Sequence, residues 1–286
     1  MTQAVVSATE VAIKEPPEIE HLLTFQEYLD YEVQPGVLYE LVKGKLIPMG
    51  ATTHNHTNIY RFLVHKFQRY FATKKLDLVV TGLATGVRTE EKTSRIPDVV
   101  VYSKAVWNKV RHRPGAGVLD FDEKPMLVIE IVSSDLRNDY VIKRNEYEVV
   151  EIAEYWIYDP KEKRVRVFAN PSNEEGYRFV DFPAETSIVS SQFEEFSLSV
   201  KELLDPPSVE DLILAEQAEM ETWKQQAETE RQRAEAERQR AETERQRAET
   251  ERQQAQAERQ RTEKLAQRLL KMGVPPDEID KIISED

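Results

Sequence analysis

Three charged side chains lie in apolar surroundings, where burial would be costly. Asp98 interrupts the run RIPDVVVY, Glu130 interrupts PMLVIEIVSS, and Lys143 follows in NDYVIKRNEYEVV. A carboxylate in the middle of a hydrophobic strand is expensive to bury unless a partner compensates its charge. Two carboxylates on neighbouring strands with a lysine after them therefore indicate a divalent-metal site, in which oxygen ligands hold a cation that activates water.

The same side chains also fit two other roles. Both acids could be buried partners of basic residues, Asp98 with Arg95 and Glu130 with Lys143. The residues alone favour this structural role and the metal site equally. A pair of acids also serves glycoside hydrolases, but we disfavour that class because the tryptophans are not clearly placed as aromatic sugar platforms.

Both acids are expected on central strands of a sheet. Asp98 shares one face of its strand with Val100 and Tyr102, and the other face is apolar too. Glu130 lies in the similarly apolar run MLVIEIV. Strands with two apolar faces are typical of the interior of a sheet that is covered on both sides.

A helix is expected to begin near Arg137, directly after the strand of Glu130. Lys143 fills a gap in the apolar stripe of this helix. A lysine on an inward stripe either extends to the rim or meets a carboxylate, and Glu130 is a plausible partner because the helix starts right after its strand. The stripe consists of Leu136, Tyr140, Tyr147 and Val150.

Two further side chains are candidates near the ends of other elements. Glu40 lies in the hairpin VLYELVKGKLIPMG, which turns at Lys43 and Gly44. It is either an edge carboxylate, the better interpretation of Glu40 alone, or a third acidic group of the site. His56 lies in the first turn of a helix from His54 to about Lys75, where a solvated or capping histidine is the more common explanation.

The remaining pattern predicts an α/β (α+β) protein. Thr24 begins a short helix with a capping box, and further strands are expected in LDLVVTG, ATGVRT, KRVRVFA and GYRFVDF. AEYWIYD and KRVRVFA form a hairpin around Asp159-Pro160, whereas residues 103–124 are expected to be a long irregular connection. FSLSVKELL closes the globular part with a strand and a helical turn.

Composition limits the classes of function. The 286 residues carry a formal net charge of −13, and residues 1–209 contribute 25 basic and 32 acidic side chains. This acidic balance counts against strong sequence-independent binding of nucleic acid. The chain has no cysteine, and no signal peptide or membrane-length apolar run is recognisable, so we expect no membrane association and a cytoplasmic location.

The tail has a seven-residue repeat close to AETERQR, with alanine at 227, 234, 241, 248 and 255. Glutamate precedes arginine by three residues in each unit, which supports a helix. A strict period of seven favours a left-handed supercoil, but a coiled coil needs two apolar residues per repeat. A single charged helix and an alanine-seamed coiled coil are equally good interpretations, and Leu265, Leu269 and Leu270 could promote homo-oligomer formation.

These features together resemble the bacterial Uma2 (DUF820) family of the PD-(D/E)XK nuclease superfamily. The matching pieces span roughly residues 24–204 and form a fairly specific set in this order. They are YELVKGKL, the helix start His56-x-x-Ile59-x-x-x-Leu63, IPDVVVY, LVIEIVSS, and Lys143-x-x-x-Tyr147 followed by EYWIYDP.

The resemblance implies a restriction-endonuclease-like core, a mixed central sheet flanked by helices, here followed by a long charged C-terminal helix. It implies Asp98 and Glu130 as ligands of Mg²⁺ or Mn²⁺ in an endonuclease that hydrolyses DNA. The superfamily pattern expects a lysine at the position of Val132, and we expect Lys143 to reach the same point from its helix. Glu40 is then an additional acidic group of the catalytic set.

The alternative function is that of a catalytically inactive nuclease-fold module that binds or assembles through its tail. The expected divisions are a disordered arm (1–20), the nuclease-like domain (21–205), a linker with the heptad-repeat helix (206–270) and a short helical end (271–286).

Overall fold

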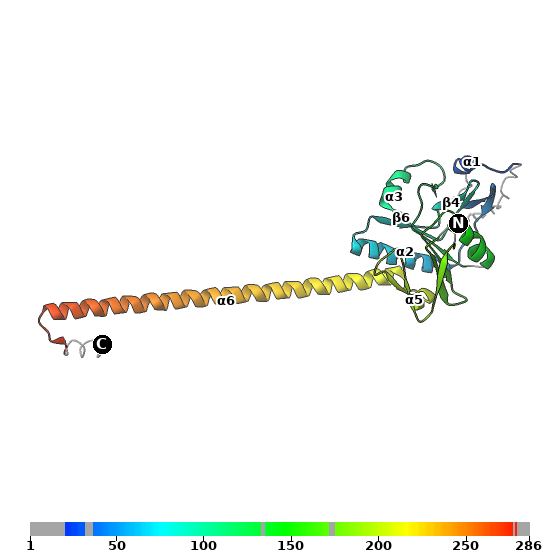
Figure 1. Cartoon of the computed structure of the whole chain (residues 1–286). Coiled ribbons are helices and arrows are strands. Elements are labelled where there is room, and N and C mark those ends of the chain that lie inside the picture. Colours follow the sequence, from blue (N-terminus) through cyan, green and yellow to red (C-terminus); the bar gives the residue numbers. More distant parts are fainter. Residues whose placement is uncertain (1–20, 32–36, 133–134, 172–174, 277, 279–286) are drawn as a thin grey trace, which may run out of the picture. The chain divides into compact units, whose positions relative to one another are not determined.

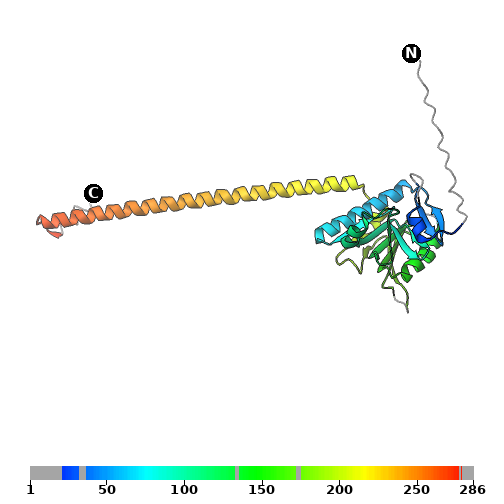
Figure 2. The ribbon, with the colours of Figure 1, turned by 90° about the horizontal axis from the view of Figure 1, so that it is seen from above.

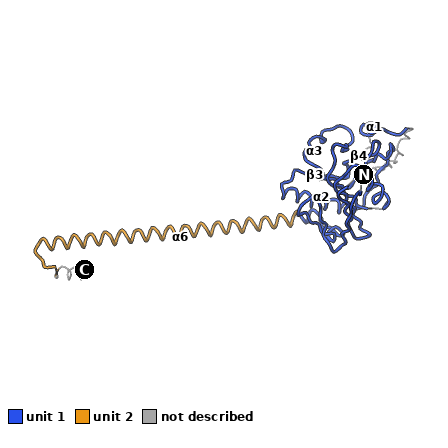
Figure 3. Tube along the Cα trace, in the orientation of Figure 1, with its two compact units in different colours: residues 1–212 blue, residues 213–286 orange. Residues whose placement is uncertain are grey.

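Strands predominate in the first part of the chain and a single helix in the second (Figure 1). The computed structural model describes residues 21–31, 37–132, 135–171, 175–276 and 278. The chain divides into two compact units, residues 1–212 and 213–286 (Figure 3). The arm expected at 1–20 and most of the helical end expected at 271–286 lie outside the described residues.

A six-stranded mixed sheet forms the centre of the first unit (Figure 2). Its order is β11-β10-β9-β8-β6-β3, in which β8 and β9 are parallel and all other neighbours antiparallel. β8, which carries Glu130, and β6, which begins directly after Asp98, are both interior, as expected. The bounds are β3 (Leu78–Thr81), β6 (Val99–Ser103), β8 (Leu127–Ile131), β9 (Glu154–Asp159), β10 (Arg164–Ala169) and β11 (Arg178–Pro183).

Helices cover both faces of this sheet. On one face, α2 (His54–Lys74) packs Ile59 and Phe67 against apolar side chains of β6, β8 and β9. On the other face lie α3 (Lys104–Val110) and α4 (Arg144–Val149), the latter through Tyr147. Burial on both faces explains the continuous apolar runs of the central strands. The mixed sheet flanked by helices that the sequence predicts is confirmed.

The first unit also contains a five-stranded sheet, with the strand order β2-β1-β5-β4-β7. The hairpin predicted at Lys43 and Gly44 is present, and both residues have positive φ angles of 51° and 81°, as a tight two-residue turn requires. The capping box of Thr24 and Glu27 at the start of α1 (Phe25–Leu29) is also present. The strands are β1 (Tyr39–Val42), β2 (Lys45–Pro48), β4 (Gly86–Glu90), β5 (Thr93–Arg95) and β7 (Val118–Leu119).

A two-stranded sheet and a short helix complete the first unit. β12 pairs antiparallel with β13, which leads directly into α5. The predicted strand and helical turn in FSLSVKELL are therefore present. The three short elements are β12 (Ser187–Val189), β13 (Ser197–Ser199) and α5 (Val200–Leu204).

The segment between β6 and β8 is more ordered than its sequence predicts. The irregular connection expected over 103–124 is wrong, because α3 begins at once with Ser103 as its N-cap and β7 follows. The buried carboxylate of Glu123 holds the segment together by accepting hydrogen bonds from Arg113. A contact between residues ten positions apart leaves no periodic pattern in the sequence, which is why pattern analysis missed it.

Glu123 should make the stability of this segment depend on pH. Burial raises its pKa, but hydrogen bonds from Arg113, the N–H of Asp120 and Lys109 together lower it to about 2. Because the folded-state pKa lies below the ordinary value, the stabilisation is complete above about pH 5 and is lost as the pH falls through the folded-state pKa.

We expect Glu123→Gln to reduce the free energy of unfolding at pH 7 by on the order of 1–3 kcal/mol. The reduction should be much smaller at pH 3, where the wild-type carboxylate has already lost most of this advantage. Urea unfolding at the two pH values measures both quantities, and an equal reduction at both would contradict the assignment.

The helix after β8 is wound differently from the expected α-helix. It begins as a π-helix, η1 (Asn138–Lys143), and continues as α4. The wider turn buries Asp139 together with Lys143 and leaves Leu136 48% exposed, so the placement of Leu136 on the inward stripe was wrong. Tyr147 is fully buried, as predicted. π-helical turns are rare in proteins as a whole, and those that occur are often found at functional sites.

The heptad repeat lies entirely within one helix, α6 (Val209–Lys271). Its 63 residues include none that is buried. The long charged C-terminal helix predicted from the sequence is therefore confirmed. Within the residues that the structure describes, no helix has the length and apolar character needed to cross a membrane.

Candidate active site

Asp98 and Glu130 lie next to each other, Asp98 directly before β6 and Glu130 in the adjacent strand β8. The expectation that Asp98 lies within the strand was off by one residue, because β6 begins at Val99. β6 and β8 pair with Val99 opposite Ile129, so the next pair in the same antiparallel register is Asp98 opposite Glu130. Opposite residues of an antiparallel pair project from the same face of the sheet. The Asp98 carboxylate is fixed there because its Oδ2 accepts a hydrogen bond from the N–H of Ile131 at 2.7 Å.

Lys143 reaches this acidic pair from η1. Its Nζ lies 2.9 Å from Oε1 of Glu130 and 3.4 Å from Oδ1 of Asp139. The hydroxyl of Tyr147 donates a second hydrogen bond to Oε1 of Glu130, at 3.2 Å. All of these side chains are buried. The ion pair of Lys143 with Glu130, which the structural alternative predicted, is thus present.

Burial and like charges shift the pKa values of this group. Burial raises the pKa of Glu130 to about 8. The positive charge of Lys143 lowers this pKa, whereas the negative charges of Asp98 and Asp139 raise it further. Burial lowers the pKa of Lys143, but Glu130, Glu40 and Asp139 outweigh it and raise that pKa above its ordinary value. Lys143 is therefore positively charged at neutral pH, and the surrounding carboxylates favour the presence of additional positive charge.

Glu40 belongs to a buried charge cluster centred on Arg95. Arg95 donates to both carboxylate oxygens of Glu146, each at 2.6 Å, and to Oε2 of Glu40 at 3.0 Å. The other oxygen of Glu40 accepts a hydrogen bond from the N–H of Ile96 at 2.9 Å. Both Glu40 oxygens therefore hold the segment that leads to Asp98. The proposed ion pair of Arg95 with Asp98 is wrong, since Arg95 is engaged by the two glutamates.

His56 and Gly82 border Asp98 on its other sides. Nε2 of His56 lies 2.7 Å from Oδ1 of Asp98, and the histidine side chain is only 12% exposed. The N-cap of α2 is Thr53, so the expectation of a solvated or capping histidine was wrong. A Cβ atom at Gly82 would lie 1.9 Å from the carbonyl oxygen of Asp98, so only glycine permits this close approach of the two backbones.

One open pocket of about 690 Å³ brings the predicted site residues together. It is lined by all four of them and by the residues that precede and begin α2. Glu40, Asp98, Glu130 and Lys143 come from four separate segments of the chain. The charged and imidazole side chains at the pocket are Glu40, His56, Asp98, Glu130, Asp135, Asp139, Lys143 and Lys161.

Three functional candidates were missed or undervalued in the sequence. Asp139 precedes Lys143 by four residues, a spacing typical of helical ion pairs that could have identified it. His56 was noticed, but its distance of 42 residues from Asp98 gives no local signal. Glu146 pairs with Arg95 across 51 residues, and no sequence pattern indicates that contact.

The carboxylate oxygens of Asp98 and Glu130 fit a small hard cation in chemical type. Carboxylate oxygens are the ligands that Mg²⁺ and Mn²⁺ prefer, and Mg²⁺ commonly binds one or two carboxylates and keeps several waters. In the described part of the chain, no three acidic or histidine side chains are grouped so that they could hold a metal ion.

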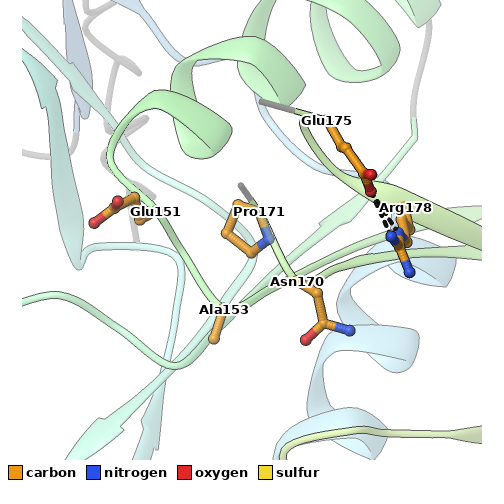
Figure 4. Close-up of a pocket in the computed structure, with 6 residues that line it drawn as sticks. All are labelled: Glu151, Ala153, Asn170, Pro171, Glu175 and Arg178. Atoms are coloured by element: carbon orange, nitrogen blue, oxygen red, sulfur yellow. Dashed lines mark hydrogen bonds and ion pairs between the residues drawn. The ribbon is translucent and has the colours of Figure 1, made fainter. Parts of the chain in front are cut away.

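A second concavity of about 590 Å³ has a different character (Figure 4). It shares no lining residue with the acidic pocket. Glu175 and Arg178 form an ion pair at its edge, and both side chains are exposed. Exposed charges that pair with each other shift pKa values only weakly. The pocket at Asp98 and Glu130 is therefore the stronger candidate for an active site.

The fold and this pocket define an α/β protein with an acidic site on a mixed sheet. A family model named Uma2, described as "putative restriction endonuclease", matches residues 25–201, and the chain belongs to this family. No curated protein matches the chain. Among solved structures it is similar to a "putative nuclease belonging to DUF820" from Anabaena variabilis ATCC 29413, with 22% sequence identity and a TM-score of 0.48. That match covers 64% of this chain and 97% of the other.

Proposed function

We propose that this protein is a metal-dependent endonuclease that hydrolyses DNA phosphodiester bonds. The observation that supports this proposal best is the convergence of Asp98, Glu130 and Lys143 from separate elements in one open pocket. Membership of a family whose description is "putative restriction endonuclease" supports the same class of reaction. The cytoplasmic location expected from the sequence stays a prediction.

Asp98 and Glu130 would hold Mg²⁺ or Mn²⁺ through their carboxylate oxygens. When bound, the ion would supply an activated water and neutralise charge on the phosphate. The Ile131 N–H keeps Asp98 in its orientation, and Tyr147 does the same for Glu130. These donors reduce the freedom of the two ligands before any ion binds, which lowers the cost of assembling the site.

Lys143 would orient the attacking water or the phosphate through its ammonium group. It remains protonated because its pKa is raised, so it acts as a donor and not as a general base. Glu40 would serve as a positioning residue, because its two oxygens hold Arg95 and the N–H of Ile96. Its role would thus be exerted through the segment preceding Asp98.

The test is the conversion of supercoiled plasmid to nicked and linear forms by the full chain with Mn²⁺ or Mg²⁺. Lys143→Met should slow this conversion by about 10²-fold or more, because a preorganised charged donor is lost. Its Mn²⁺ affinity should be unchanged or higher, since a positive charge that competes for Glu130 is gone. Lys201→Met, at an exposed lysine of α5, is the matched control. Unchanged cleavage by Lys143→Met would refute the assigned role.

A second candidate is a nuclease-fold module without catalysis that assembles through residues 206–270. The observation in its favour is that α6 has no buried residue, although its first turn contacts the rest of residues 1–212 through Glu210 and Leu212. Mn²⁺ binding without plasmid conversion, together with self-association of the full chain, would favour this candidate over the endonuclease.

A further inference from the structure

The repeat in α6 extends beyond its alanines into one continuous stripe. Counting in sevens from Ile213 reaches an apolar or small residue at every step up to Leu269, eight repeats later. We call these the a positions. They are Ile213, Met220, Ala227, Ala234, Ala241, Ala248, Ala255, Thr262 and Leu269.

The residues three positions after each a residue complete the stripe, and we call them the d positions. Trp223, Leu265 and Met272 hold these positions near the two ends. Glutamate holds them in the middle, at 230, 237, 244, 251 and 258, and also at 216. Large apolar residues thus lie at both ends of the stripe, in the same phase as the central alanines.

Five large apolar side chains at the ends of the stripe are exposed to solvent. Ile213, Met220, Trp223, Leu265 and Met272 are each between 40% and 79% exposed. Such residues on a helix with a strict period of seven are typical of a face that packs against another helix. The spacing of the two ends along the helix restricts the occupant to a helix of the same length and pattern.

The orientation of a second copy follows from charge. In a parallel, in-register pair each d residue faces its own copy, which would bring six glutamates against six identical glutamates. Like charges at facing positions disfavour a pairing. In an antiparallel pair each a residue faces a d residue, so that every central glutamate lies opposite an alanine. Arginines follow the glutamates directly, at 231, 238, 245, 252 and 259, and supply complementary charge.

The orientation also follows from side-chain size. In an antiparallel register that places Ala227 opposite Glu258, the numbers of any two facing residues add up to 485. The same register places Ile213 opposite Met272 and, one repeat further, Met220 opposite Leu265; Trp223 then faces the small Thr262. Each central layer combines one small and one long side chain, so the two backbones can keep a constant separation. A parallel pair would alternate alanine layers with glutamate layers.

We propose that α6 forms an antiparallel homodimer in this register, with a second copy of the chain as the partner. The inference is independent of the metal site, because it uses only residues of the tail. It selects the coiled coil over the single helix, the two interpretations that the repeat alone left open. The alanine seam needs the apolar ends to define its register, since five nearly identical repeats could otherwise slip by seven residues.

Cysteine cross-linking of the full chain tests both orientation and register, because the natural chain has no cysteine. The variants are Ala227→Cys, Glu258→Cys and the double variant with both. The antiparallel register predicts a disulfide-linked dimer in the double variant and in an equimolar mixture of the single variants, but not in either single variant alone. The two cysteines of one chain are too far apart along the helix, on the order of 45 Å, to bond to each other.

Controls make every outcome decisive. Gln232→Cys combined with Glu258→Cys should not cross-link, because residue 232 lies on the side of the helix away from the stripe. Sedimentation should give a dimer for the wild-type chain, and Trp223→Ser, at an exposed residue, should raise its dissociation constant at least tenfold. Cross-linking of Ala227→Cys alone would establish a parallel pair and overturn the proposal. A monomer in sedimentation with no cross-link in any variant would overturn it as well.

Discussion

Asp98→Asn should abolish measurable Mn²⁺ binding and slow DNA cleavage by about 10³-fold, because the ligand charge is lost while the shape is kept. The fold should survive, since asparagine retains an oxygen that can accept the hydrogen bond from the N–H of Ile131. Isothermal titration calorimetry with Mn²⁺ and Mg²⁺ on the full chain, followed by the plasmid assay, measures both effects. Glu130→Gln should behave in the same way.

The matched control is Asp122→Asn, which removes an equal charge from an exposed side chain. Its metal binding and cleavage should equal those of the wild type. A variant of Asp98 or Glu130 that binds Mn²⁺ unchanged, or that simply unfolds, would show that the acid has a structural role. Thermal unfolding of each variant separates these cases, because a lost ligand leaves the melting temperature of the metal-free protein nearly unaffected.

Arg95→Met should lower the free energy of unfolding by about 3–5 kcal/mol, the cost of leaving buried charges without their partner. Arg95 is 4% exposed and is the shared donor to Glu40 and Glu146. Those two carboxylates would face each other without a counterion. Urea unfolding at pH 7 measures the loss, and a change below about 1 kcal/mol would contradict the importance of the cluster.

A matched control and a double variant sharpen this test. Arg178→Met removes an arginine whose side chain is 75% exposed and should change stability by less than about 0.5 kcal/mol. Adding Glu146→Gln to Arg95→Met should recover part of the loss, because one unpaired charge is removed. The Arg95 variant should also cleave more slowly where it is still folded, since Glu40 would no longer hold the segment before Asp98 in place.

An acidic residue within an apolar strand indicates a buried charge, but it does not by itself indicate an active site. Glu154 is completely buried at the start of β9, in the run EYWIYD, and resembles Glu130 in sequence context. Its oxygens accept hydrogen bonds from Trp156 and from the segment after β12, which includes Ser190 and Ser191. Glu130 instead faces Asp98 and a pocket. Sequence context alone does not separate the two glutamates, because the difference lies in which distant donors reach each one.

Local interactions account for what could be predicted. The apolar runs of β6 and β8, the Lys43-Gly44 turn, the Thr24 capping box and the helix of the tail are all patterns of residues within a few positions of one another. Residue types and periods of two, 3.6 or seven express such interactions directly. The set Asp98, Glu130 and Lys143 was found in the same way, since each carries a charge that its apolar surroundings make costly.

Contacts between distant segments account for the rest. His56 beside Asp98, Arg95 between Glu40 and Glu146, and Glu123 as the anchor of the segment after β6 join residues with no common pattern. The π-helical start of the helix after β8 brings Asp139 toward Lys143 and depends on packing against the sheet. Charges and periods in the sequence therefore determined which residues had to find partners. Three-dimensional packing alone decided which partners they found, because a buried charge is satisfied by whatever donor the fold brings within hydrogen-bonding distance.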